Sequence, residues 1–251
     1  MLLEAFARAR GRLGDEAILV IAGGGALFDG QEYREAWWRD ADRLGLSVHD
    51  VAAGPAPVQA NVIILGIVAE AQMPVLYRAA DVLAFPSTRE GFGMVVLEAM
   101  ASGTPTVVAD IPVLREHLTD DVDCVMVSAG DSGPLSNALV SVARDEQLRR
   151  RLVTAGAATA ARFTWSASAH AHEDLYTRVL RDFGELVPDV QKVSAAGRVG
   201  LVVVMIDQPF TIPKRMASGG MANPSTTMPA TRWAVVCARR REVAELVQPR
   251  V

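Results

Sequence analysis

Short apolar runs alternate with longer amphipathic segments over about the first 183 residues of the chain. Each apolar run is rich in β-branched residues and is too short for a buried helix, which predicts a strand. The segments between the runs have the length and spacing of helices. The predicted strands are Ile18–Ile21, Val62–Leu65, Val82–Phe85, Thr106–Ala109 and Val125–Val127, and the predicted helices cover about 31–44, 71–79, 94–101, 135–143, 145–160 and 166–182.

Strands that are separated by helices, and that read as nearly continuous apolar runs, indicate a parallel sheet covered on both faces. The expected fold class is therefore α/β, a Rossmann-like parallel sheet with helices on both faces. Ligands of such sheets bind beyond the carboxyl ends of the strands. The glycines 23–25 follow the first strand, Gly66 follows the second and Glu90 follows the third, so all three positions should meet at one edge.

The chain changes character after Gly184. Strand-like runs at 199–206 and 233–237 and a helical run at 240–247 surround a stretch rich in Met, Ser, Gly and Pro. We therefore expect one Rossmann-like domain over 1–183 and an uncertain C-terminal extension over 184–251. Weak order is expected for residues 207–230, and no function is assigned to the extension.

Composition and charge exclude several classes of function. A net charge of -4 argues against a broad nucleic-acid surface. Cys124 and Cys237 have no metal-binding spacing and form no disulfide framework, which fits a reducing cytoplasm. Residues 1–4 lack the basic start and long apolar core that are typical of a signal peptide, and no apolar stretch of the sequence is as long as a transmembrane segment. The expected location is the cytoplasm, with peripheral attachment to a membrane left open.

Glu90 and Glu98, separated by seven residues, carry the strongest chemical signal. Glu98 lies in an apolar helical segment, and burying a carboxylate costs several kcal/mol unless hydrogen-bond donors meet it. A ligand rich in hydroxyl groups would supply those donors. Gly91 and Gly93 allow close approach of the backbone, and the helix that follows offers N–H groups and a partial positive charge to a phosphate. A polyol end and a phosphate end together describe a nucleotide sugar.

The segments 79–87, 90–93 and 97–105 resemble the donor-binding C-terminal half of retaining glycosyltransferases of the GT-B fold, in family 4. Phe163–Ser166 resembles the signal that precedes the last helix of such domains, and the similarity spans about residues 1–183. The resemblance implies that Glu90, the catalytic candidate, binds hydroxyls of the donor sugar, and that Glu98 binds the ribose. The implied donor-binding residues are Glu90, Gly91, Phe92, Gly93, Met94, Val95, Glu98, Gly24, Gly25, Gly66, Ile67 and Val68.

The same resemblance implies that the nucleotide sugar is a substrate and that neither a cofactor nor a metal is used. It also implies an N-terminal acceptor domain, a first strand, and an Arg and a Lys just before the helix at Leu2. These parts are missing from the sequence, which has no lysine before Lys192, and this argues against catalysis by the chain alone. An acceptor-domain chain is therefore an expected partner, and the acceptor is unknown.

Three functions follow as hypotheses. The first is the donor-binding domain of a retaining hexosyltransferase. The second is a truncated, non-catalytic module that binds a nucleotide sugar, and the third is a phosphorylase or sugar-nucleotide epimerase built on the same sheet.

Other interpretations of these residues stay open. The two carboxylates could cap and solvate a surface helix, or form the acid–base pair of a hydrolase. The glycines 23–25 could form a plain tight turn, whereas a dinucleotide fingerprint would need a glycine where Phe28 stands. The four histidines form no zinc pattern, although His117 could approach the cleft. Arg89 and Arg115 are the local candidates for phosphate charge, with solvated roles as the alternative.

Overall fold

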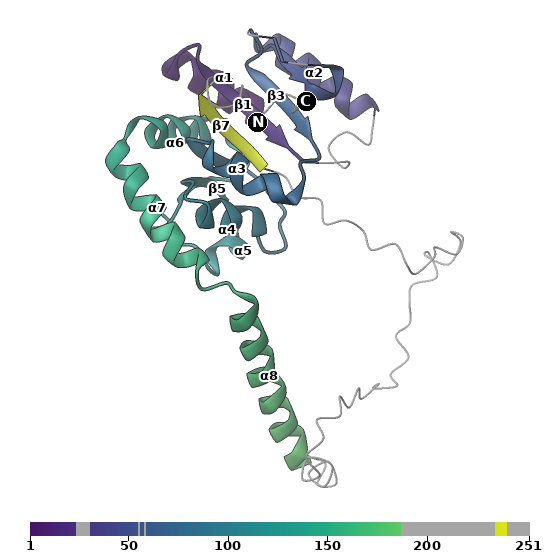
Figure 1. Cartoon of the computed structure of the whole chain (residues 1–251), viewed down its shortest axis with the longest axis vertical. Coiled ribbons are helices and arrows are strands. Elements are labelled where there is room, and N and C mark those ends of the chain that lie inside the picture. Colours follow the sequence, from purple (N-terminus) through teal and green to yellow (C-terminus); the bar gives the residue numbers. More distant parts are fainter. Residues whose placement is uncertain (24–30, 55, 58, 187–233, 240–251) are drawn as a thin grey trace, which may run out of the picture. The chain divides into compact units, whose positions relative to one another are not determined.

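The computed structural model describes residues 1–23, 31–54, 56–57, 59–186 and 234–239 (Figure 1). By its contacts the chain divides into two compact units, one of residues 1–163 with 231–251 and one of residues 164–230. The first unit contains the sheet, and the second contains helix α8 (Trp165–Leu186). The domain boundary at residue 183 stays a prediction. The expected strand at 199–206, the weakly ordered stretch at 207–230 and the helix at 240–247 lie outside the described residues.

A seven-stranded sheet forms the centre of the first unit, in the order β2-β3-β1-β7-β4-β5-β6. All neighbouring strands pair in parallel except β7, which is antiparallel to both of its neighbours. The α/β fold class and its parallel sheet are thus confirmed. The strands are β1 (Ala17–Ala22), β2 (Val48–Asp50), β3 (Val62–Gly66), β4 (Val82–Phe85), β5 (Thr106–Asp110), β6 (Val125–Ser128) and β7 (Ala234–Arg239).

Strand β7 lies in the middle of the sheet, where Figure 1 shows it in yellow between purple and blue strands. It pairs with β1 over six residue pairs, from Ala17 opposite Arg239 to Ala22 opposite Ala234. It pairs with β4 over three residue pairs, centred on Leu83 opposite Val236. The strand predicted near 233–237 is therefore confirmed, and it joins the two parallel halves of the sheet.

Successive side chains of each strand point to opposite faces of the sheet, so the apolar strands give it two apolar faces. Helices cover both of these faces. In β1, Ile18 and Val20 belong to one buried cluster, whereas Leu19 and Ile21 belong to the other. The first cluster includes residues of α3, α4 and α5, and the second includes residues of α1, α2 and α6; helix α7 contributes to both. The helices are α1 (Leu2–Leu13), α2 (Gln31–Arg43), α3 (Met73–Arg78), α4 (Met94–Ala101), α5 (Pro112–Arg115), α6 (Ser132–Arg144) and α7 (Glu146–Ala160).

Short polar side chains define several helix starts. Asp131 and Asp145 accept hydrogen bonds from Gly133 N–H and Leu148 N–H, both at 2.9 Å, and so cap α6 and α7. The Thr164 hydroxyl accepts from Ala167 N–H at 3.1 Å, so Thr164 caps α8. No helix of the described part is both long and apolar enough to cross a membrane.

Candidate functional site

The ends of β1 and β3 meet at the carboxyl edge of the sheet. Gly23 N–H donates to the Gly66 carbonyl at 2.8 Å, which links the two loops that follow these strands. Beyond Gly66, the Ile67 side chain is 84% exposed and Val68 packs against the core. The structure thus brings Gly23, Gly66, Ile67 and Val68 to one rim, whereas Gly24 and Gly25 lie outside the described residues.

Helix α4 begins on the next part of this rim, and its start requires a glycine. Gly93 has a φ of 86°, in the left-handed region, and no side chain caps the helix. A Cβ at Gly93 would lie 2.6 Å from Cδ2 of Leu114, which is fully buried under the loop. The first N–H groups of a helix have no acceptor within that helix. The backbone of Met94 and Val95 therefore presents donors and a partial positive charge at this edge.

Glu98 lies one turn further along α4 and is half-buried between the buried Leu97 and Ala99. The hydroxyl of Tyr77 in α3 donates to its Oε2 at 3.0 Å. The Tyr77 side chain is itself buried, and the Thr104 hydroxyl donates to the Tyr77 carbonyl at 2.6 Å. The protein thus supplies part of the donor set that the sequence pattern ascribed to a ligand, and Tyr77 fixes the position of the Glu98 carboxylate.

Glu90 has a different environment, because its side chain is exposed. Its Oε1 accepts a hydrogen bond from Gly91 N–H at 2.9 Å, so the carboxylate lies against its own loop. The side chain of Phe92 on the same loop is 40% exposed, and that of Met94, the first residue of α4, is 50% exposed. The two carboxylates therefore differ: Glu98 is held by a neighbouring helix, and Glu90 by the backbone of its loop.

Phe92 belongs to a cluster of three aromatic rings. It stacks on His117, with ring centroids 4.9 Å apart and planes at 13°. Phe163 lies edge-on to both rings, at 5.6 Å from Phe92 and 5.5 Å from His117. The Nε2 of His117 is buried without a hydrogen-bond partner among the described residues, and burial lowers the pKa of this histidine. The sequence left open that His117 could approach the cleft but gave no sign of its two ring partners.

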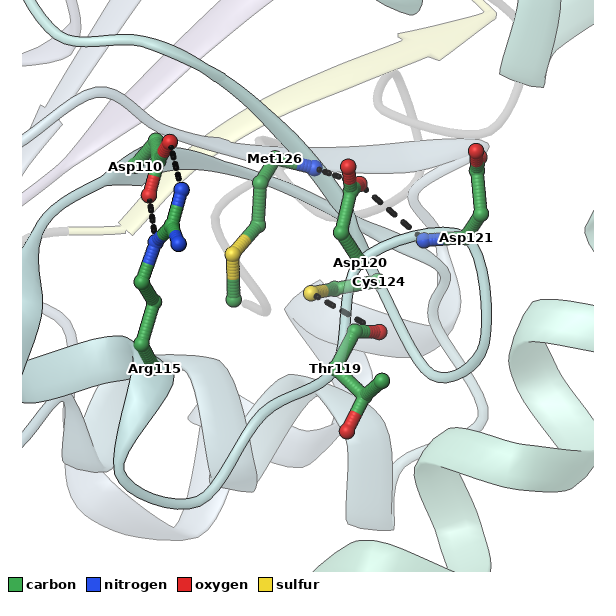
Figure 2. A network of polar contacts seen from close by, with 7 residues as sticks. All are labelled: Asp110, Arg115, Thr119, Asp120, Asp121, Cys124 and Met126. Atoms are coloured by element: carbon green, nitrogen blue, oxygen red, sulfur yellow. Dashed lines mark hydrogen bonds and ion pairs between the residues drawn. The ribbon is translucent and has the colours of Figure 1, made fainter.

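Arg115, a candidate for phosphate charge, already forms an ion pair. Its guanidinium donates two hydrogen bonds to the two oxygens of Asp110, at the end of β5 (Figure 2). The hydrogen bond from Arg115 lowers the pKa of the Asp110 carboxyl, and the pairing raises the pKa of Arg115. The Asp110 carboxylate therefore neutralises the positive charge that Arg115 would otherwise offer to a phosphate at this rim.

The other residues in Figure 2 hold the loop between α5 and β6. The Asp120 carboxylate accepts from Met126 N–H at 2.7 Å and from Asp121 N–H at 3.0 Å. The buried Cys124 thiol lies 3.9 Å from the Thr119 carbonyl, and desolvation raises its pKa strongly. A raised pKa lowers the reactivity of the thiol, because the thiolate is the reactive form.

Two further features bear on the site. Within the described ranges, no three His, Cys, Asp or Glu side chains are grouped as metal ligands, and the expectation of metal-independent donor binding stays a prediction.

A cavity of about 410 Å³ lies near the amino ends of β1 and β4, with Asp15, Glu16, Asp81 and Arg144 in its wall. That edge is opposite the ligand-binding edge of a parallel sheet.

The comparison with protein families agrees with the fold. The model of the family described as glycosyl transferases group 1 matches residues 1–159, which is more than half of the chain. The protein belongs to this family. This chain is 41% identical over 116 residues to a phosphatidyl-myo-inositol mannosyltransferase of Mycobacterium leprae, covering 46% of this chain and 31% of that protein.

Other relatives give the same assignment. The chain is 30% identical to a D-inositol 3-phosphate glycosyltransferase of Nocardia farcinica, over 73% of this chain and 38% of the relative. A solved Anabaena protein, Alr3699/HepE in complex with UDP and glucose, matches with a TM-score of 0.57 at 26% identity, covering 70% of this chain and 44% of that one. The chain thus spans less than half the length of each of these three relatives.

Proposed function

We propose that this glycosyltransferase chain binds a nucleotide sugar and takes part in transfer of its hexosyl group, with retention, to an acceptor. The proposal rests mainly on one observation, the start of α4. Gly93 places uncapped N–H groups at the edge of the sheet where ligands of this fold bind. A diphosphate is the part of a nucleotide sugar that such a helix start would bind.

In this proposal the two carboxylates have separate roles. Glu98, oriented by Tyr77, accepts hydrogen bonds from the ribose hydroxyls. Glu90, on its exposed loop, accepts from hydroxyls of the sugar. Gly66, Ile67 and Val68 lie beside the base.

The chemistry of transfer depends on holding the donor in place and on stabilising charge as the diphosphate leaves. The N–H groups of Met94 and Val95 would supply part of that stabilisation. We further propose that the chain acts as the donor-binding half of a family 4 GT-B enzyme without a metal, with an acceptor domain from another polypeptide. The Anabaena relative was solved with UDP and glucose, which makes UDP-glucose the first donor to test.

The experiment is calorimetric titration of the full chain with UDP, GDP and ADP and with their hexose conjugates. A carboxylate hydrogen bond of about 1.5–3 kcal/mol corresponds to a loss of about ten- to 150-fold in affinity. Glu98→Gln should weaken binding of the free nucleotide and of its conjugate by similar factors. Glu90→Gln should weaken only the conjugate.

A matched control is Glu146→Gln. This change alters an exposed glutamate that pairs with Arg150 in the first turn of α7. This variant should bind like the wild type. If neither Glu98→Gln nor Glu90→Gln changes any affinity, the assignment of the site is wrong.

A second candidate is a module that binds the donor without turning it over. The ion pair between Arg115 and Asp110 favours it, because the charge of this guanidinium is compensated on the rim. Incubation with radiolabelled UDP-glucose separates the two candidates. A catalytic chain should release labelled sugar, whereas a binding module should retain affinity without release.

A further inference from the structure

The rings of Phe92, His117 and Phe163, here called the aromatic clasp, come from three separate segments of the chain. Phe92 belongs to the loop before α4, His117 follows α5, and Phe163 follows α7. Each ring contacts the other two, at centroid distances from 4.9 to 5.6 Å. The clasp therefore joins the ends of three helices beside the candidate site.

The clasp fixes the loop that carries Glu90. Phe92 stands between Gly91 and Gly93, so its backbone is part of the turn that leads into α4. The buried Leu114 lies directly under Gly93, and His117 stacks against the Phe92 ring, so that the loop is held at two neighbouring positions. Because the Glu90 carboxylate bonds to the N–H of Gly91, its position follows that of the loop.

Phe163 ties this loop to a boundary of the chain. It is the last residue of the first compact unit, and its N–H donates to the Ala160 carbonyl at 3.0 Å. The next residue, Thr164, begins the second unit and caps α8 with its hydroxyl.

We propose that Phe163 is a positioning residue: through His117 and Phe92 it holds the Glu90 loop in place, and it sets how strongly the site distinguishes a nucleotide sugar from the free nucleotide. The inference rests on the proposed function of the rim. It adds that discrimination of the sugar depends on a ring that does not contact the ligand.

The test compares UDP with UDP-glucose by calorimetry, with the full chain and its variants. Phe163→Ala should lower the ratio of the two affinities by about two- to tenfold, which is the range expected for aromatic pairs. Binding of UDP alone should change by less than about twofold, because Glu98 and α4 keep their contacts. Phe163→Tyr keeps the ring and should keep the ratio, and Trp165→Ala, which removes a 93% exposed indole, should bind like the wild type.

A second readout needs no nucleotide. Trypsin can cleave after the exposed Arg89, one residue before Glu90, and loosening of the loop should speed this cleavage by about two- to tenfold in Phe163→Ala. Cleavage after the exposed Arg150 of α7 serves as the internal reference.

The outcomes separate the two proposals. Equal weakening of UDP and UDP-glucose, or an unchanged ratio with an unchanged cleavage rate after Arg89, would overturn the role of Phe163. If the wild type binds no nucleotide at all, the proposed function fails. The link between Phe163 and the loop is then decided by the cleavage rate alone: faster cleavage in Phe163→Ala supports it, and an unchanged rate refutes it.

Discussion

Replacing Gly93 with alanine should destabilise the protein more than the same replacement of Gly103, although both glycines flank α4 and have nearly equal φ angles, of 86° and 82°. A left-handed residue other than glycine costs about 1–2 kcal/mol at either position. At Gly103 a Cβ would meet nothing within 4 Å, whereas at Gly93 it would lie 2.6 Å from Cδ2 of Leu114. Overpacking of a buried site adds about 1–3 kcal/mol. We therefore expect losses of about 1–2 kcal/mol for Gly103→Ala and about 2–5 kcal/mol for Gly93→Ala.

Urea unfolding monitored by circular dichroism measures both losses, and the Tm of Gly93→Ala should fall by about 4–20 °C, since 1 kcal/mol shifts Tm by about 2–4 °C in a domain of this size. Combining Gly93→Ala with Leu114→Ala should cost less than the sum of the two single changes, because removal of the Leu114 side chain relieves the overlap. Equal losses for the two glycine variants, or strict additivity with Leu114→Ala, would refute the packing argument.

Three further predictions concern single side chains. Tyr77→Phe removes the hydroxyl that donates to Glu98 and should weaken nucleotide binding about tenfold by calorimetry, as expected for a hydrogen bond to a charged group; unchanged affinity would separate Tyr77 from the site. Burial lowers the pKa of His117 in the folded protein, so the unfolded state binds more protons below its usual pKa of about 6.5. Stability should fall as the pH drops from about 7 to 5, and less so in His117→Phe, whereas parallel curves of Tm against pH would contradict this. Burial also raises the pKa of Cys124, so in a Cys237→Ser variant this thiol should react with Ellman's reagent only after unfolding, and rapid reaction in the native state would contradict its burial.

The sequence predicted those strands whose side chains are buried on both faces. Val82–Phe85 and Thr106–Ala109 read as unbroken apolar runs, and the structure has β4 at the same residues and β5 one residue longer. By contrast, β2 has only three residues, all half-buried, and α5 has four residues, so neither gives a periodic signal. The spacing of apolar residues indicates burial only over a run of several residues, so it cannot detect elements as short as β2 and α5.

Parts of the candidate site could be predicted from residues whose chemistry restricts where they occur, such as glycine in a tight turn. Gly91 and Gly93 were expected to allow close approach of the backbone, and the structure adds that Gly93 has a left-handed conformation with no room for a Cβ beside Leu114. Tyr77 was missed, although a tyrosine in an apolar helix needs a partner for its hydroxyl, and this need was a usable signal. No such signal exists for the aromatic clasp, because Phe92, His117 and Phe163 meet only through the tertiary packing of three helices.

Strand β7 adds an argument about the size of the ligand. A doubly wound sheet binds its ligand at the carboxyl ends of the strands, and here β7 separates the two halves that carry the candidate residues. Gly23 and Gly66 follow β1 and β3 on one side of β7, whereas Glu90 and Gly93 follow β4 on the other. Neighbouring strands lie about 4.8 Å apart, so β1 and β4 are separated by about 10 Å. A free sugar would therefore reach one half of the rim, and contact with both halves requires an elongated ligand such as a nucleotide joined to a sugar through a diphosphate.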